Sequence, residues 1–312
     1  MNDRRIIYVL EPFDAPFGGV AIIYRHVELL AARVYSAFVH LPEQPTVDFY
    51  ASRAPLLVGG FSLRSSDILV IPEILGWALR QFKPLPVRRL MFCQNHNHLP
   101  AGVAGPAVLA EWGVDGVIAS SEIVRAHLQA VYGLQNVPLL PCAVDTSRFS
   151  PARSKQRQIA FMPRKLPHDA VFIQAEFKRS HPRYADVPWV AIDGVTQTKA
   201  ARMLGESAVF LSLSHRESLG LPPLEAMACE CLVAGYHGEG GREFATSQNG
   251  WWAASGDARA CIDGLAAALD VLERDGEPLA ARRLAMAETV ARYGERRMET
   301  ELLAFWQAEL GV

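Results

Sequence analysis

Two glutamates, Glu217 and Glu225, stand eight positions apart around a Gly-Leu-Pro-Pro sequence in the stretch HRESLGLPPLEAMACECLVAGYHGEGGREF (215–244). Consecutive prolines suit the first turn of a helix, where backbone N–H groups have no intrahelical partner and φ is already helical. This spacing predicts Glu217 on a loop and Glu225 inside the helix that follows. Because the prolines donate nothing, backbone donors for an anion come mainly from 218–221, assisted by the positive helix end. The binding candidates are Ser218, Leu219, Gly220, Leu221 and Glu225.

This arrangement suits a ligand that carries a diphosphate. A carboxylate one turn into the helix, Glu225, can accept hydrogen bonds from both hydroxyls of a ribose. The loop carboxylate, Glu217, can reach the hydroxyls of a sugar beyond the phosphates. One short segment would then span a whole nucleotide sugar. The alternative interpretation is that Glu217 is a surface loop residue, Glu225 a solvated helix residue and the glycines only turns.

The elements that must position these residues follow from the pattern along the chain. Short β-branched runs alternate with helical patterns, which is typical of parallel sheets covered on both faces. The strands expected are 6–12, 67–73, 88–94 and 115–120, then 158–163, 189–194, 208–214 and 231–236. Residues 141–158 are polar and punctuated by proline, which favours a domain junction there. We expect an α/β fold with doubly wound domains at 1–150 and 151–289.

Three helices can be placed from their flanking residues. One is expected after the glycine turn PFGGV (16–20), where apolar residues recur at helical spacing. A second is expected between a cap at Ser120 or Ser121 and a stop at Gly133. A terminal helix at about 290–312 is expected to return onto the N-terminal domain.

Composition and charge exclude several classes of protein. There are 12 basic and 12 acidic residues up to position 150, and 19 and 21 after it, so neither half is a basic nucleic-acid platform. The five cysteines are scattered, without paired C-x-x-C zinc spacing, which favours a reduced, cytoplasmic protein. No uncharged apolar run approaches the roughly 18 residues of a membrane span, and no cleavable signal pattern is seen. Peripheral association with the inner membrane face is left open.

The segment 215–244 resembles the E-x7-E signature of retaining glycosyltransferases with the GT-B fold, specifically family 4. In that family E-x-F-G-L-P-x-L-E-A-M-A is followed by a strand and a G-G-x-x-E loop. The agreement runs through Glu217, Gly220, Leu221, Pro222, Glu225, Ala226, Met227, Ala228, Gly240, Gly241 and the neighbourhood of Glu243. The resemblance implies a GT-B architecture, with two doubly wound Rossmann-like domains facing across a cleft. It places the donor mostly on the C-terminal domain and the acceptor mostly on the N-terminal domain.

The resemblance also implies an activity. A sugar would be transferred from a nucleotide diphosphate sugar, with retention of anomeric configuration, to a glycan, a lipid-linked acceptor or a small molecule. Polysaccharide assembly is the context that the family suggests. No cofactor and no metal are expected, because no D-x-D aspartate pair lies near the proposed phosphate site.

Further site residues are carried over from the family position by position. PFGGV looks like the family's first glycine loop, so Gly18 and Gly19 would approach the donor phosphates and the acceptor; the alternative is a plain strand-to-helix turn. FMPRKLP (161–167) lies where the family has basic residues that neutralise the diphosphate, which implies Arg164 and Lys165. The family's lysine-glycine pair a few residues later is missing, which weakens the assignment of Lys165.

One further candidate comes from its position in the chain. In QNHNHLP (94–100), His96 follows an expected strand, at the edge where ligands enter open α/β sheets. It would hydrogen-bond the transferred sugar or the acceptor; the alternative is a structural histidine.

Two rival functions stay open at this stage. Only 53 positions separate Arg164 from Glu217, so one strand-helix unit of the family is expected to be absent. This motivates the alternative that the protein is catalytically inactive and binds nucleotide or glycan. A phosphorylase or a sugar-nucleotide epimerase is a more distant rival, because none of the five lysines has an evident cofactor setting.

Overall fold

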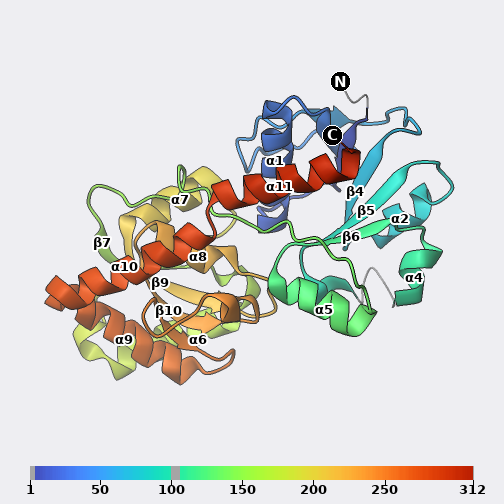
Figure 1. Cartoon of the computed structure of the whole chain (residues 1–312). Coiled ribbons are helices and arrows are strands. Elements are labelled where there is room, and N and C mark those ends of the chain that lie inside the picture. The colour runs from blue at the N-terminus through green and yellow to red at the C-terminus, as the bar shows by residue number, and fades with distance from the viewer. Residues whose placement is uncertain (1–3, 100–105, 312) are drawn as a thin grey trace. The chain divides into compact units, whose positions relative to one another are not determined.

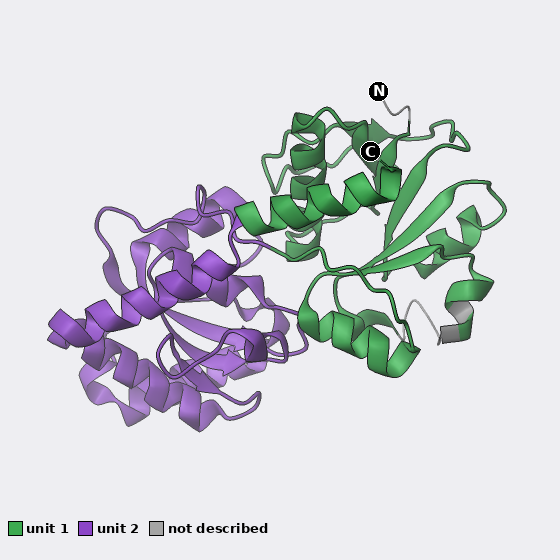
Figure 2. Ribbon diagram, in the orientation of Figure 1, with its two compact units in different colours: residues 1–142, 296–312 green, residues 143–295 purple. Residues whose placement is uncertain are grey.

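The computed structural model describes residues 4–99 and 106–311, so Pro100 and Val312, which end two of the expected segments, lie outside it. The chain forms two compact units (Figure 2). Unit 1 comprises residues 1–142 and 296–312, and unit 2 comprises residues 143–295.

Unit 1 is built on a six-stranded parallel sheet in the order β3-β2-β1-β4-β5-β6 (Figure 1). The central strand β1 has the sequence IIYV, and all four side chains are buried, as expected where helices cover both faces. The strands are β1 (Ile6–Val9), β2 (Ala37–Leu41), β3 (Leu56–Val58), β4 (Ile68–Pro72), β5 (Arg88–Cys93) and β6 (Gly116–Ala119).

The helices of unit 1 follow the strands in the manner of βαβ units. They are α1 (Gly18–Ala32), α2 (Gly76–Phe82), α4 (Pro106–Glu111), α5 (Glu122–Tyr132) and α11 (Glu295–Leu310), with a short 3₁₀ helix η1 (His96–His98). The predicted limits of α5 are confirmed. The Ser121 side chain accepts a hydrogen bond from the Val124 N–H, and Gly133 ends the helix with a φ of +64°. Only a residue without Cβ adopts that φ without strain.

The last helix, α11, belongs to unit 1 from Arg296 onward, although it is far from the rest of unit 1 in sequence. Trp306 is completely buried in unit 1. Figure 1 shows α11 beside α1, and an ion pair of 2.6 Å joins Arg33, at the end of α1, to Glu299. The helix thus fills part of the core of unit 1, as the predicted returning helix was expected to do.

Unit 2 is built on a five-stranded parallel sheet in the order β11-β10-β9-β7-β8. All eight residues of β9, SAVFLSLS, are buried, so this strand runs through the middle of the core. The strands are β7 (Gln156–Phe161), β8 (Trp189–Ala191), β9 (Ser207–Ser214), β10 (Leu232–His237) and β11 (Trp251–Ala253).

The helices of unit 2 connect these strands and close the unit. They are α6 (Pro167–Ser180), α7 (Gln197–Glu206), α8 (Leu221–Ala228), α9 (Ala258–Arg274) and α10 (Gly276–Arg292), with 3₁₀ helices η2 (Pro163–Lys165), η3 (Pro182–Tyr184) and η4 (Gly240–Glu243). The polar stretch before β7 packs on unit 2, because the Ala152 N–H donates to the Gly205 carbonyl at 3.1 Å.

Candidate functional site

The sheet of unit 2 reverses its strand order between β7 and β9. The chain passes from β7 to β8 on one side and then crosses to β9 on the other. In open parallel sheets ligands bind at such a point, beyond the carboxyl ends of the strands. The two loops that diverge there are 162–166 and 215–220. These loops hold the predicted cations and the predicted loop glutamate.

The structure brings Lys165 and Glu217 together at this point. The Lys165 Nζ forms an ion pair with the Glu217 carboxylate. The Lys165 side chain is 47% exposed, whereas that of Glu217 is 12% exposed, so the carboxylate is the more enclosed partner. Ser214, the last residue of β9, donates from its Oγ to the second Glu217 oxygen at 3.4 Å. Arg164 lies next to Lys165 in η2, with an exposed side chain.

The glycine and prolines after Glu217 shape the start of α8 as predicted. Gly220 precedes the helix with a φ of +83°, and a Cβ there would lie 3.0 Å from a Glu217 oxygen. Pro222 and Pro223 lie in the first turn. The side chain of Leu219 is buried, so only its backbone can meet a ligand.

A second loop, after β10, holds the loop of Glu217 in place. The Gly240 N–H donates to the Glu217 carbonyl at 2.8 Å, and the Glu239 N–H donates to the His215 carbonyl at 3.0 Å. A Cβ on Gly240 would lie 2.4 Å from the Leu219 N and Cα atoms. The first glycine of the pair noted in the sequence, Gly240, is therefore a packing requirement of the glutamate loop.

Glu225 lies inside α8, as predicted, with a partly buried side chain. Among the described residues, none is seen to form a hydrogen bond or ion pair with its carboxylate. Burial, and secondarily the charge of Glu217, raise the pKa of Glu225 to about 8. The carboxyl groups of Glu217 and Glu225 are thus close enough to interact electrostatically.

This raised pKa predicts a pH-dependent stability of unit 2. The folded state retains a proton on Glu225 that the unfolded chain releases near the ordinary value of 4.5, so stability falls as pH rises from there to about 8. Glu225→Gln removes this pH-dependent loss of stability, because glutamine does not titrate. We expect its melting temperature to gain a few degrees on wild type between about pH 5 and about pH 9. The exposed Glu288→Gln is the control, and parallel curves for all three proteins would contradict the expectation.

In unit 1 the strand order reverses between β1 and β4. The glycines expected in a turn after β1 are instead the first two residues of α1, Gly18 and Gly19. The Gln94 side chain donates from Nε2 to the Gly19 carbonyl at 2.9 Å, and a Cβ on Gly19 would lie 2.8 Å from the Gln94 Oε1. A Cβ at this position would therefore displace the end of the Gln94 side chain and break its hydrogen bond to Gly19.

Sequence reasoning missed Glu73, which follows β4 and is 2% exposed. Its carboxylate accepts hydrogen bonds from the Gln94 N–H at 2.9 Å and the Asn95 N–H at 3.0 Å. It also lies 3.5 Å from the His98 Nδ1. Glu73 therefore fixes the start of the loop that carries His96. The signal that could have found it is an acidic residue directly after an apolar strand.

His96 lies in η1, where its ring packs against that of His127 with centroids 4.6 Å apart. Gly18, Gly19 and His96 thus gather at the carboxyl edge of the unit 1 sheet. Arg164, Lys165, Glu217 and Glu225 gather at the carboxyl edge of the unit 2 sheet, with Ser218, Leu219, Gly220 and Leu221.

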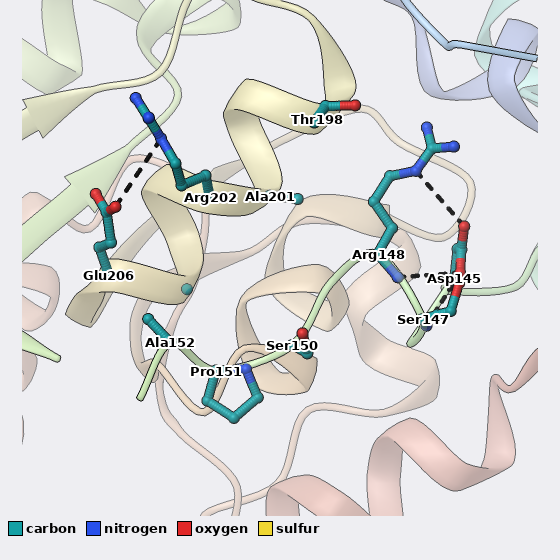
Figure 3. Close-up of a pocket in the computed structure, with 11 residues that line it drawn as sticks. Asp145, Ser147, Arg148, Ser150, Pro151, Ala152, Thr198, Ala201, Arg202 and Glu206 are labelled. Atoms are coloured by element: carbon teal, nitrogen blue, oxygen red, sulfur yellow. Dashed lines mark hydrogen bonds and ion pairs between the residues drawn. The ribbon is translucent and has the colours of Figure 1, made fainter. Parts of the chain in front are cut away.

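A pocket of about 530 Å³ in unit 2 is separate from these residues (Figure 3). It is lined by Asp145, Ser147, Arg148, Ser150, Pro151, Ala152, Thr198, Ala201, Arg202, Gly205 and Glu206. Its residues precede β7 and β9, so it lies at the amino ends of the strands, opposite the ligand-binding edge of a parallel sheet. Its arginines pair with acids of its own lining, Arg148 with Asp145 and Arg202 with Glu206. None of the predicted site residues lines it.

Within residues 4–99 and 106–311, no group of three or more histidine, cysteine or acidic side chains is arranged to hold a metal ion. Over the same ranges, no helix combines the length and apolar character needed to cross a bilayer.

Known proteins resemble this chain in the sequence of part of it and in the fold of the whole. Residues 192–280, which contain Glu217 and Glu225, match the family model described as Glycosyl transferases group 1. A curated relative, the Alpha-1,6-glucosyltransferase of Actinobacillus pleuropneumoniae serotype 7 (strain AP76), is 30% identical over 179 residues. The match covers 56% of this chain and 54% of that protein, so it spans about half the length of the relative.

Solved structures resemble the whole chain. A glycosyltransferase from Rickettsia africae ESF-5 has a TM-score of 0.73 at 15% identity, and sucrose-phosphate synthase from Thermosynechococcus elongatus has 0.74 at 15%; each comparison covers 99% of both chains. HepE of Anabaena, solved in complex with UDP, has a TM-score of 0.69 at 13% identity and covers 97% of this chain and 100% of that one. The chain therefore has two parallel-sheet α/β domains that resemble those of GT-B glycosyltransferases, and the segment that matches a glycosyltransferase family model holds both glutamates.

Proposed function

We propose that the protein is a glycosyltransferase that moves a sugar from a nucleotide diphosphate sugar to an acceptor hydroxyl. The observation that carries this proposal is the meeting of Lys165 and Glu217 at the strand-order reversal of unit 2, with Glu225 beside them. A cation, two carboxylates and a helix start together offer partners for phosphates and for hydroxyls. The match of residues 192–280 to a glycosyltransferase family supports the same function.

Each group has a part in holding the donor. Glu225 accepts hydrogen bonds from the ribose hydroxyls, and Glu217 accepts them from the sugar that is transferred. The backbone of residues 218–221 and the start of α8 bind the diphosphate. Arg164 and Lys165 neutralise the charge of the diphosphate. In the free protein Lys165 pairs with Glu217, so donor binding exchanges this ion pair for contacts with phosphate and sugar.

The chemical step follows from this placement. The bond between the anomeric carbon and the leaving phosphate oxygen breaks, and the acceptor oxygen forms a new bond on the same face, which retains the anomeric configuration. The acceptor hydroxyl gives its proton to the departing diphosphate. Arg164 and Lys165 stabilise the charge that builds on the diphosphate, without a metal. From unit 1, His96 hydrogen-bonds the transferred sugar or the acceptor, and the backbone of Gly18 and Gly19 approaches them.

The identity of the donor is proposed from the relatives. The curated relative is named for alpha-1,6 transfer of glucose. HepE of Anabaena has been solved with UDP-glucose, at a TM-score of 0.70 and 13% identity over 97% of this chain and 99% of that one. We therefore take UDP-glucose as the first donor to test.

Glu225→Ala is expected to weaken the binding of UDP and UDP-glucose. Because Glu225 is protonated near neutral pH, losing this acceptor for ribose hydroxyls costs about 0.5–1.5 kcal/mol, which is roughly a 2- to 12-fold rise in Kd. Calorimetric titration of the folded variant measures this, with Glu288→Ala as the exposed control on α10. Unchanged affinity in a folded Glu225→Ala protein would remove the ribose contact. Hydrolysis of UDP-glucose without acceptor would separate an active enzyme from an inactive binding protein.

A further inference from the structure

The strand-order reversal of unit 1 carries an exposed aromatic side chain that the donor site does not use. Trp77 lies in the first turn of α2, which follows β4, and is 43% exposed. Its Nε1 donates a hydrogen bond of 2.5 Å to Glu11, which follows β1. Because β1 and β4 are neighbours across the reversal, this contact joins the two loops at the ligand-binding edge of the sheet. Ile74, which lies between β4 and α2 in sequence, is 56% exposed.

The Glu11–Trp77 contact contributes little to the stability of the fold. Both side chains are exposed, and a hydrogen bond that competes with water has a small net value. Its effect is geometric, since it favours one orientation of the indole while leaving much of the ring open to solvent. A large apolar ring held in this way at a binding edge is suited to a ligand with an apolar face and hydroxyl groups.

The loop that carries Glu11 is itself anchored. The Tyr50 hydroxyl accepts from the Phe17 N–H at 2.7 Å and donates to the Phe17 carbonyl at 3.0 Å. The ring of Phe13 packs against that of Tyr50, with centroids 5.7 Å apart. The carboxylate of Glu11 is therefore presented by a braced segment, so a ligand that binds there meets a partly preorganised site.

The charge of this edge limits the ligand. Residues 10–17 and 73–79 contain the acids Glu11, Asp14 and Glu73 and no lysine or arginine, and the guanidinium of the next residue, Arg80, lies over the Trp112 ring, 5.0 Å from its centroid. A phosphorylated lipid or another anion would be repelled by these groups and would find no cation in either segment. A neutral pyranose fits, because its C–H groups pack on the negative face of an indole and its hydroxyls donate to carboxylates.

We propose that Trp77 and Glu11 form an acceptor subsite for a neutral carbohydrate. The role of the bound carbohydrate as acceptor rests on the proposed function. The binding of a sugar to the subsite does not, because it needs no turnover. The acceptor is then a glycan, and a lipid phosphate has no place on these two segments.

The test measures binding to the whole chain without turnover. Maltotriose, isomaltotriose and cellotriose are titrated into wild type, Trp77→Ala, Glu11→Gln and Phe172→Ala, and phosphatidylglycerol vesicles form the anionic arm. Phe172 is the matched control, because it is an exposed aromatic residue, 54% exposed, on α6 of unit 2. We expect at least one trisaccharide to bind wild type, with affinity lowered about ten-fold by Trp77→Ala, less by Glu11→Gln and not by Phe172→Ala.

UDP-glucose is titrated into the same four proteins, and we expect equal affinities. Trisaccharide binding that depends on Trp77, without any UDP-glucose binding, would overturn UDP-glucose as the donor and leave the subsite standing. The subsite is overturned if no trisaccharide binds wild type, if Trp77→Ala binds as tightly as wild type, or if only the vesicles bind through Trp77.

Discussion

Replacing Lys165 by alanine is expected to lower turnover with UDP-glucose by about 10²–10³-fold, the loss typical of removing one group that stabilises developing charge. The Lys165 Nζ already sits at the strand-order reversal of unit 2, against Glu217. The leaving diphosphate gains negative charge as the glycosidic bond breaks, so a fixed cation there favours the transition state more than the bound donor. Donor affinity should therefore change much less than turnover.

Steady-state rates, with donor affinity measured separately, check this result. Lys178→Ala, on the exposed part of α6, is the control. Lys165→Arg should recover only part of the rate, because a planar guanidinium does not reproduce the compact ammonium charge. If Lys165→Ala turns over at nearly the wild-type rate, Arg164→Ala becomes the variant expected to show the loss. Complete loss of turnover in a chelator, restored by magnesium or manganese, would show that the two cations are not sufficient.

Gly240→Ala is expected to damage both stability and donor binding. A Cβ would lie 2.4–2.5 Å from three backbone atoms of Leu219, and backbone cannot move aside as the end of a flexible side chain can. Such overpacking costs about 1–3 kcal/mol of unfolding free energy, occasionally more. The relief that is available is a shift of the loop 215–220, which would displace Glu217. We therefore expect UDP-glucose affinity to fall even where the variant stays folded.

Gly60→Ala is the matched control for this variant. Gly60 is exposed, has no atom within 4 Å of its ideal Cβ and has an ordinary φ, so alanine there should be neutral or slightly stabilising. Chemical denaturation gives the free energy of unfolding, and titration gives the affinity. Normal stability together with normal UDP-glucose affinity in Gly240→Ala would mean that the two loops are not coupled.

The parts of the fold that could be predicted are those with local signals. The buried runs that became β1, β4, β5, β7 and β9, the proline start of α8 and the glycine stop of α5 depend on neighbouring residues alone. The strands that were not predicted, β2, β3 and β11, are short, with three to five residues, and lie at or near the sheet edges. Their pairing partners, rather than their own sequences, make them strands.

The candidate site shows the same division. The loop position of Glu217 and the helical position of Glu225 followed from two prolines. The contact of Glu217 with Lys165 could not follow, because it needs β9 to pair with β7 although β8 lies between them in sequence. Glu73 was missed for a similar reason. Its position directly after an apolar strand is a local signal, but its hydrogen-bond partners lie 21 and 22 positions away and cannot be identified from that signal.

The domain junction was expected within residues 141–158, with the domains drawn as 1–150 and 151–289, and the two units divide after Cys142. Most of the polar stretch that indicated the junction belongs to unit 2. The Lys155 Nζ, for example, donates to the Gly205 carbonyl at 3.1 Å. Low apolar content identified a segment without a core strand, but backbone and lysine hydrogen bonds decided which unit it joined.

The burial of Trp306 in unit 1 has a consequence for the order in which the protein is made. Synthesis proceeds from the N-terminus, so residues 1–142 leave the ribosome long before the helix that fills part of their core. All of residues 143–295 must be translated first. Unit 2 can therefore close its core while the chain is still growing, and unit 1, although made first, is completed last.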